Sequence, residues 1–296
     1  MALPSDRAFP SDEVPPAIPM AGGRSVRLNR DREITPTVLD AYRICPRKFR
    51  LQYIDKVKTP WRYEHNLSQG RVAHLLLADA ARRLRAGAPQ LAIDDMRARA
   101  GREIPLDPFP SREAHADAVH QVVQWVETGV RALLQDPDGE ILLIETDQKR
   151  SFGPDDPLWV SFRGDLVRWS ADAEGEVIEV IDYKTGRPRV DPMVPVIARF
   201  VLNRYLERQF GQSGWRLRAR FTYVWLNDRD LTAIDLDSRS CVEPWRMVSE
   251  LVRRLFAEED WAPTPSPLCK WCRFYKTVCD AGETASPGLL FEGPGE

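Results

Sequence analysis

The sequence has no run of about 18 apolar residues, the length that a membrane-spanning helix needs, so it predicts no transmembrane segment. Its first residues, MALPSDRAFPSDEVPP, contain neither a basic segment nor an apolar one, and we expect no secretory signal. Five cysteines in 296 residues are an odd number and do not indicate the disulfide framework of a secreted protein. We therefore expect a cytoplasmic protein in a reducing compartment.

Glycine and proline, at 17 and 24 residues, are too few for a fibrous or wholly disordered chain. There is no internal repeat and no G-x-x-x-x-G-K-[ST] loop, so any unwinding activity must come from a partner. Hydrophobic residues make up 43% and charged residues 29%, an ordinary composition for a globular protein with a sizeable core.

The net charge is only −2, but the charges are unevenly distributed. Residues 136–182 contain 13 acidic and 4 basic side chains, whereas residues 42–58 and 199–220 each contain 6 basic and 1 acidic. Separate acidic and basic regions are typical of a metal site flanked by phosphate-binding walls. Ordinary solvated surfaces would give the same pattern, so the charge distribution alone leaves both interpretations open.

The expected elements follow the order helices, strands, helices. Residues 1–33, with five prolines, are expected to be a disordered leader, 34–282 a single domain, and 283–296 a flexible tail. Thr35 and Pro36 predict a helix that runs to Ile44, and Pro46 begins another. Longer helices are expected at 68–84, 111–135, 193–210 and 244–257, and strands at 141–147, 158–163, 165–169, 176–182 and 219–226. This order indicates an α/β or α+β fold.

The segment VIEVIDYKTG is the most informative part of the sequence. An apolar strand delivers Asp182 and, two residues later, Lys184, and alternation places both side chains on one face. A carboxylate and an ammonium so placed suit metal-dependent phosphodiester cleavage, because the carboxylate holds a divalent metal and the lysine orients a water. Asp165, beside Gly164 on a preceding strand, is placed to supply a second carboxylate. Taken alone, such a triplet is more typical of a surface ion pair.

His74 lies in GRVAHLLLADAA, among apolar residues at helical spacing. A single histidine in such a helix is commonly a core or capping residue. Its imidazole would also suit the same metal site as Asp165 and Asp182.

Together these residues carry a resemblance. The order Gly70-x-x-x-His74, Gly164-Asp165, then Asp182-Tyr183-Lys184-Thr185-Gly186 resembles the PD-(D/E)XK nuclease superfamily, and within it the RecB-type and CRISPR-associated exonucleases, over about residues 35–280. The resemblance implies a restriction-endonuclease-like fold, a central mixed sheet flanked by helices. It also implies Mg²⁺ or Mn²⁺ bound by the side chains of His74, Asp165 and Asp182 and the carbonyl of Tyr183, with Lys184 supporting the attacking water. Members often carry Gln-x-x-x-Tyr on the next helix, whereas here Val201 precedes Tyr205.

Three cysteines, Cys269, Cys272 and Cys279, form a C-x2-C-x6-C triplet, and a four-coordinate site needs one more ligand. Cys45 is the best candidate, because it precedes Pro46 at a helix N-terminus, where the dipole favours a thiolate. Four thiolates suit a [4Fe–4S] cluster or a structural zinc ion, and the spacing does not separate them. The resemblance favours the cluster, which would join the N- and C-terminal segments. Unliganded thiols are the remaining alternative.

The sequence thus predicts a metal-dependent DNA nuclease, an exonuclease acting on single-stranded or frayed DNA ends in recombination, repair or defence. Candidate nucleic-acid contacts are Arg47, Lys48, Arg187 and Tyr205. A helicase or another repair or defence protein is a candidate partner. One alternative is a catalytically silent DNA-binding or scaffold subunit, and another is a nuclease acting on RNA or on structured junctions.

Overall fold

The computed structural model describes residues 33–59, 64–107, 109–136, 139–151, 158–211, 217–237, 239–279 and 281. Apart from Glu33, the expected leader 1–33 lies outside these residues, as does the expected tail 283–296. The described chain forms two compact units. The first falls within residues 63–150 and 160–247, and the second within 33–62, 151–159 and 248–281.

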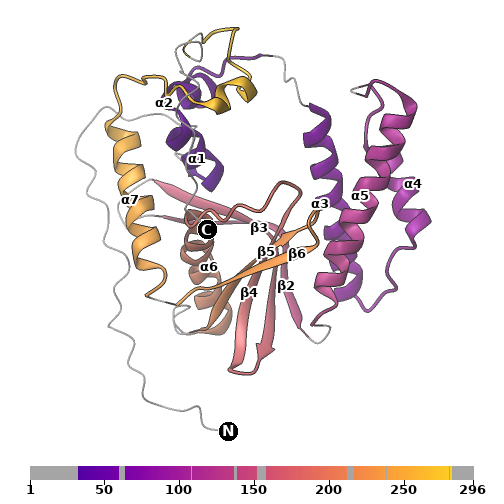
Figure 1. The fold of residues 1–296 in the computed structure, drawn as a ribbon. Helices are drawn as coiled ribbons and strands as arrows, with labels where there is room; N and C mark the ends of the chain where they lie inside the picture. Colours follow the sequence, from indigo (N-terminus) through magenta and orange to yellow (C-terminus); the bar gives the residue numbers. More distant parts are fainter. Residues whose placement is uncertain are drawn as a thin grey trace, which may run out of the picture. The chain divides into compact units, whose positions relative to one another are not determined.

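The first unit is built on a mixed β-sheet (Figure 1). Its strands are β2 (Glu140–Ser151), β3 (Trp159–Asp172), β4 (Gly175–Lys184), β5 (Ala219–Trp225) and β6 (Asp230–Asp235). β3 pairs with β2 and antiparallel with β4, β4 runs parallel to β5, and β5 runs antiparallel to β6. In β4, residues 177–183 are all buried, which explains its continuous Val/Ile-rich sequence, because both faces of the strand are covered.

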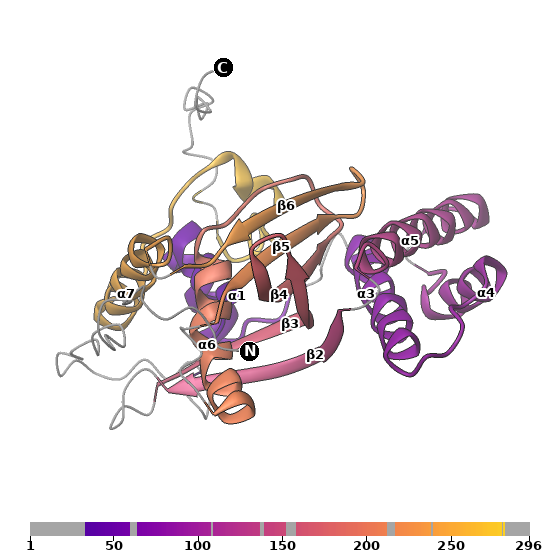
Figure 2. The same ribbon diagram turned by 90° about the horizontal axis from the view of Figure 1, so that it is seen from below.

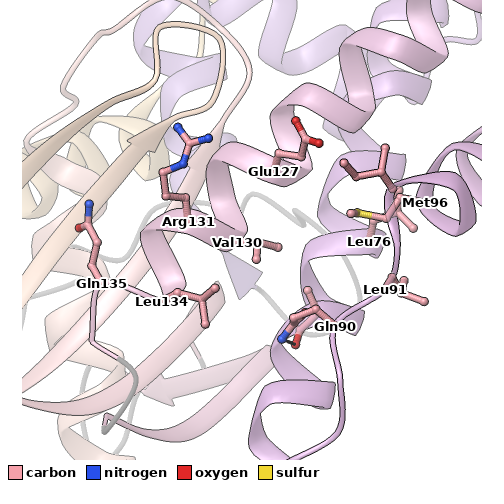
Figure 3. A pocket seen from close by; sticks show the side chains of 11 residues that line it. Leu76, Gln90, Leu91, Met96, Glu127, Val130, Arg131, Leu134 and Gln135 are labelled. Carbon is pink, nitrogen blue, oxygen red and sulfur yellow. Dashed lines mark hydrogen bonds between the residues drawn. The ribbon is translucent and has the colours of Figure 1, made fainter.

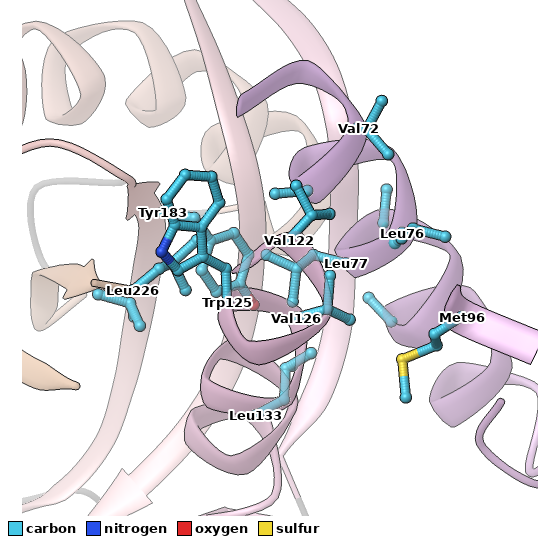
Figure 4. Close-up of a cluster of buried hydrophobic side chains, with 14 of the residues drawn as sticks. Val72, Leu76, Leu77, Met96, Val122, Trp125, Val126, Leu133, Tyr183 and Leu226 are labelled. Carbon is cyan, nitrogen blue, oxygen red and sulfur yellow. The ribbon is translucent and has the colours of Figure 1, made fainter. Parts of the chain in front are cut away.

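One face of the sheet packs against α3 (Glu64–Arg85) and α5 (Arg112–Leu133), with α4 (Ile93–Glu103) beside them. Figure 4 shows the apolar cluster that joins these helices to the strands, with Trp125 of α5 beside Tyr183 of β4. Ser111 caps α5 by accepting a hydrogen bond from the backbone N–H of Ala114 at 3.1 Å. Since Ile181 and Tyr183 both belong to this cluster, Asp182 and Lys184 lie on the other face of β4.

The opposite face of the sheet carries α6 (Met193–Phe210) (Figure 2). Trp169 of β3 contacts Phe210 at 4.7 Å between ring centroids, and Arg150 of β2 lies over the ring of Phe200. Eleven residues of α6 are buried, and the helix ends at Gly211, whose φ of 66° is the left-handed conformation that glycine adopts readily. The two helical layers therefore enclose the strands that carry the acidic residues.

The second unit contains β1 (Glu33–Ile34), α1 (Pro36–Ile44), α2 (Pro46–Phe49), a π-helical turn (Arg50–Ile54), and the 3-10 helix η3 (Pro267–Trp271). α7 (Val242–Ala257) spans the sequence boundary between the units. Phe49 stacks on Trp261 at 5.7 Å, and the Tyr42 hydroxyl donates to Glu258 at 2.9 Å. Aromatic packing therefore already joins the N- and C-terminal segments of this unit.

The expected α/β architecture with a central mixed sheet is confirmed, with differences in detail. The strands expected at 158–163 and 165–169 are one continuous strand, β3, which runs through Gly164. The helix expected from residue 68 begins at Glu64. The sequence patterns gave no indication of α4 or β6; β6 alternates between exposed and half-buried residues and has no strongly apolar run. Among the described residues, no helix is long and apolar enough to cross a membrane.

Candidate metal and catalytic site

Two carboxylates lie side by side on β3 and β4. Leu166 pairs with Ile181, so Asp165 and Asp182 are the next residues along the two strands, on the same face. Both are buried, with 8% and 5% of their surface exposed. Oδ2 of Asp165 accepts a hydrogen bond from the backbone N–H of Tyr183 at 2.6 Å, which fixes the carboxylate against the end of β4.

His74 on α3 reaches the same place. Its Nδ1 lies 3.0 Å from Oδ1 of Asp165, and its ring meets Tyr183 edge-on at 6.3 Å between ring centroids. The imidazole is half-buried, not enclosed in the core, and it contacts carboxylates. Burial alone would lower the pKa of His74, but hydrogen bonds and charges from Asp165 and Glu145 raise it to about 10.

Glu145 on β2 completes the group, and sequence reasoning missed it. Its Oε1 lies 3.6 Å from Nδ1 of His74, and single ligand atoms of His74, Glu145 and Asp165 all lie within 4.8 Å of one another. Glu145 adopts a φ of 49°, a left-handed conformation that is uncommon for a non-glycine residue. The only signal in the sequence was the pair of acidic residues, Glu145 and Asp147, that follows the apolar run in ILLIETD.

Arg163 binds the far side of the Glu145 carboxylate. Its Nε lies 3.4 Å from Oε2 of Glu145 and 3.7 Å from the carboxylate of Asp147. Because the Arg163 side chain is 59% exposed, this ion pair is screened by solvent. It leaves the Oε1 atom of Glu145 directed to the histidine.

Lys184 forms an ion pair with Asp182, as their positions two residues apart on β4 predict. The Nζ atom lies 2.7 Å from Oδ2 of Asp182, and the lysine remains half-exposed while the carboxylate is buried. Burial raises the pKa of Asp182 to about 6; the charge of Lys184 opposes this rise, and that of Asp165 adds to it. Asp182 also lies in register with Tyr223 of β5, whose pKa burial raises.

The converging imidazole nitrogen and carboxylate oxygens are a donor set that suits a divalent cation such as Mn²⁺ or Mg²⁺. The lysine beside them brings a positive charge to the edge of the same group. A positive charge held in place in this way can stabilise negative charge that develops on a phosphodiester.

The four candidate cluster cysteines all lie in the second unit as free thiols. Sγ of Cys45 caps α2 by accepting from the backbone N–H of Lys48 at 3.4 Å, and it accepts from the N–H of Thr264 at the same distance. Sγ of Cys269 accepts from the N–H of Ser266 at 3.4 Å, at the start of η3. The fifth cysteine, Cys241, is buried in the first unit.

The predicted nucleic-acid contacts are spread over both units. Arg187 is exposed, three residues beyond Lys184, whereas Arg47 and Lys48 are half-buried on α2 of the second unit. Tyr205 is half-buried on α6, and burial raises its pKa, with a further contribution from Glu140 at the start of β2. The carboxylate whose charge raises the pKa of Tyr205 is therefore that of Glu140, not that of Glu145, Asp165 or Asp182.

Helix α6 also carries two buried polar residues, Arg199 and Asn203, which are four positions apart. Arg199 is 2% exposed and donates from Nη2 to the carbonyl of Leu217 at 2.6 Å, and burial lowers its pKa to about 10. Asn203, one helical turn later, is fully buried. Val201, at the place where the resemblance expects a glutamine, is a buried apolar residue.

A groove with a volume of about 600 Å³ lies among the helices of the first unit (Figure 3). It is lined by side chains from α3, α4, α5 and the segments beside them: Leu76, Ala80, Gln90, Leu91, Ile93, Met96, Glu127, Val130, Arg131, Leu134 and Gln135. These lining residues include none of the candidate site residues, which are His74, Glu145, Asp165, Asp182 and Lys184. The groove is therefore separate from the candidate site.

Comparisons with known proteins identify the family to which the chain belongs. No curated protein matches the chain. Among solved structures, that of a "Putative exonuclease" from Eubacterium rectale is 11% identical, with a TM-score of 0.47, and the match covers 86% of this chain and 94% of that one. The protein SSO0001 is 14% identical, with a TM-score of 0.36 and coverage of 86% and 88%. The sequence model of the PD-(D/E)XK nuclease superfamily matches residues 33–280, and the chain therefore belongs to that superfamily.

Proposed function

We propose that this nuclease is a metal-dependent deoxyribonuclease, an exonuclease that degrades single-stranded or frayed DNA ends in recombination, repair or defence. The observation that carries the proposal is the group formed by His74, Glu145 and Asp165 beside the Asp182–Lys184 ion pair. Nucleases of this superfamily use divalent metals, and the donors present fit that requirement.

His74, Glu145 and Asp165 would hold the ion, Mg²⁺ or Mn²⁺, with Asp182 and the carbonyl of Tyr183 completing the set that the family resemblance implies. When bound, the ion supplies Lewis-acid polarisation of the scissile phosphodiester. Glu145 is a proposed ligand that the sequence did not suggest; its backbone is left-handed, and its Oε1 lies 3.6 Å from Nδ1 of His74.

The remaining steps belong to the side chains of β4. Asp182 holds Lys184 through the 2.7 Å ion pair, and the ammonium would orient the attacking water and balance the negative charge that develops on the phosphoryl oxygens. The hydroxyl of the water joins phosphorus while its proton goes to the departing oxygen, which leaves a phosphate on one product end and a hydroxyl on the other.

The test is cleavage of end-labelled single-stranded DNA with Mn²⁺ or Mg²⁺ by protein purified without oxygen. Lys184→Ala should abolish cleavage but retain metal binding, whereas Lys149→Ala, on β2, should cleave as the wild type does. Equal cleavage by wild type and Lys184→Ala would mean that the site is misassigned. Absence of cleavage by folded, metal-loaded wild type would favour the DNA-binding or scaffold subunit, and a substrate panel distinguishes RNA and junctions.

We further propose that Cys45, Cys269, Cys272 and Cys279 bind a [4Fe–4S] cluster rather than zinc. Two observations support this. The Sγ of Cys45 accepts a hydrogen bond from the backbone N–H of Thr264, which is only five residues before Cys269. The sulfurs of Cys45 and Cys269 also accept hydrogen bonds from backbone N–H groups, and such bonds tune the thiolate ligands of iron–sulfur clusters. Cluster binding would add folding free energy to the second unit.

Iron and sulfide analysis together with visible absorption tests the cluster. Cys45→Ser should lose the visible absorption, while Cys241→Ser, which alters the one cysteine outside the proposed set, should keep it. One tightly bound zinc ion and no iron in the wild type would establish the zinc alternative.

The substrate and the setting follow from the same proposal. Arg47, Lys48, Arg187 and Tyr205 are proposed DNA contacts, and a helicase or another repair or defence protein is the proposed partner. The proposed compartment is the cytoplasm, as the sequence predicts.

A further inference from the structure

The segment 266–279, which contains the cysteine triplet, carries an unusual surface. It has three basic residues, Lys270, Arg273 and Lys276, and no acidic residue. Large apolar side chains of this segment are also exposed: Leu268 at 50%, and Trp271 at 54%. A single exposed apolar residue would be ordinary, but here two large apolar side chains are exposed within a segment whose charged residues are all basic, and such a patch is typical of a binding surface.

The 3-10 helix η3 presents these side chains together. Residues three apart in a 3-10 helix eclipse one another, so Leu268 and Trp271 lie on the same side. Nζ of Lys270 lies 5.4 Å from the centroid of the Trp271 ring, within the range of a cation–π contact. We call Leu268, Lys270 and Trp271 the Trp271 platform.

Phe274, three residues later, provides the contrast. It is fully buried, and the guanidinium of Arg273 lies 4.7 Å from its ring centroid. Phe274 therefore belongs to the interior of this segment, whereas Trp271 lies at its surface.

We propose that the Trp271 platform is a base-stacking site for single-stranded DNA. A flat aromatic face binds a base of any sequence, and adjacent cations bind the phosphates, which is the combination that single-strand-binding surfaces use. The basic side chains of the segment favour a polyanion over an uncharged apolar partner. A single strand is favoured over a duplex, because the bases inside a duplex are not free to stack on a side chain. The proposal rests on the proposed nuclease function and names where that substrate strand is held.

Binding is measured by fluorescence anisotropy of a labelled oligothymidylate with full-length, cluster-loaded protein and no added divalent metal, so that cleavage does not interfere. Trp271→Ala should weaken binding by about 5- to 150-fold, the range for loss of one stacked base. Trp271→Phe, which keeps an aromatic face, should recover most of the affinity. Val278→Ala removes another exposed apolar side chain from the same segment (44% exposed) and should change the affinity by less than about twofold.

An abasic strand of the same length separates stacking from charge. Trp271→Ala should leave binding of the abasic strand unchanged, because the strand has no base to stack. Lys270→Ala should weaken binding of both strands and reduce the slope of log affinity against log salt by about 0.7, the value for one phosphate contact on a single strand.

The proposal would be overturned if Trp271→Ala weakened binding of the normal and the abasic strand equally, or weakened binding of neither. A change in oligomeric state on that substitution would also overturn it, because the surface would then be assigned to a second copy of the chain. If Trp271→Ala loses its visible absorption, Trp271→Phe and Lys270→Ala carry the test. Failure here with intact metal-dependent cleavage would refute only the platform. Base-dependent binding through Trp271 without cleavage by the wild type would refute only the nuclease.

Discussion

Binding of a divalent metal should release one proton from His74. In the metal-free protein the carboxylates of Asp165 and Glu145 raise the pKa of His74 to about 10, so the imidazole carries both ring protons at neutral pH. A metal ligand must present a free nitrogen, and one ring proton therefore has to leave before the ion can bind. The ion and the proton compete for the same two carboxylates.

The magnitude follows from the two pKa values. At pH 7.5 a histidine with its ordinary pKa of 6.5 is only about 10% protonated, whereas one with a pKa of about 10 is essentially fully protonated. We therefore expect release of about one proton per metal ion at pH 7.5, against about 0.1 for an unperturbed histidine. Asp182, with a pKa of about 6, is ionised at this pH and adds little.

Isothermal titration of metal-free protein with Mn²⁺, in buffers of different ionisation enthalpy, counts these protons directly. Glu145→Gln removes one of the two carboxylates that raise the pKa of His74, so its proton release should begin to fall at a lower pH than in the wild type. His74→Gln should release none. Release of only about 0.1 proton by the wild type at pH 7.5 would refute the reasoning.

Three further predictions concern stability, measured by urea unfolding without metal. Glu179→Gln should lower the free energy of unfolding by about 3–5 kcal/mol, because Arg168, whose Nη2 lies 2.7 Å from Oε2 of Glu179, would be left with an uncompensated buried charge. The control Asp235→Asn, in an exposed ion pair, should lower it by less than about 1 kcal/mol, and equal losses would contradict the role of the buried pair. Glu145→Gly should be more stable than Glu145→Gln by about 1–2 kcal/mol, because only glycine adopts a φ of 49° without strain; a more stable glutamine variant would mean that the residue is not held in this conformation. Because the pKa of His74 is raised, its ion pairs should stabilise the wild type fully below pH 6.5 and progressively less as the pH rises towards about 10; His74→Gln should lack this loss, and parallel pH profiles would contradict it.

Local signals in the sequence predicted much of the fold. Thr35 followed by Pro36, and Gly211 after a helical pattern, mark real helix ends, because capping and the left-handed C-cap depend on residues close in sequence. The apolar run of β4 similarly predicted a buried strand. The start of α3 at Glu64 and the strand β6 were not predicted, because tertiary packing rather than a local pattern decides them.

The candidate site shows the same division. Alternation along β4 placed Asp182 beside Lys184, and the structure has them 2.7 Å apart. Glu145 depends instead on a backbone conformation that glutamate does not favour, and no side-chain periodicity indicates that a strand residue will adopt it. Its carboxylate meets His74 from a strand 71 positions along the chain, so only the assembled sheet brings the two together.

The pKa shifts on the two sides of this site have different causes but the same direction. Burial raises the pKa of Asp182 to about 6, and paired carboxylates raise that of His74 to about 10, so each shift favours the more positively charged form. Three clustered acids, Glu145, Asp165 and Asp182, repel one another, and in the metal-free protein the His74 proton and the Lys184 ammonium offset that repulsion. A divalent cation would bring two charges to the same place and release the histidine proton in exchange. Lys184, at the end of β4, would keep its ion pair with Asp182. We therefore propose metal binding as the role of His74 and a part in the chemistry as the role of Lys184.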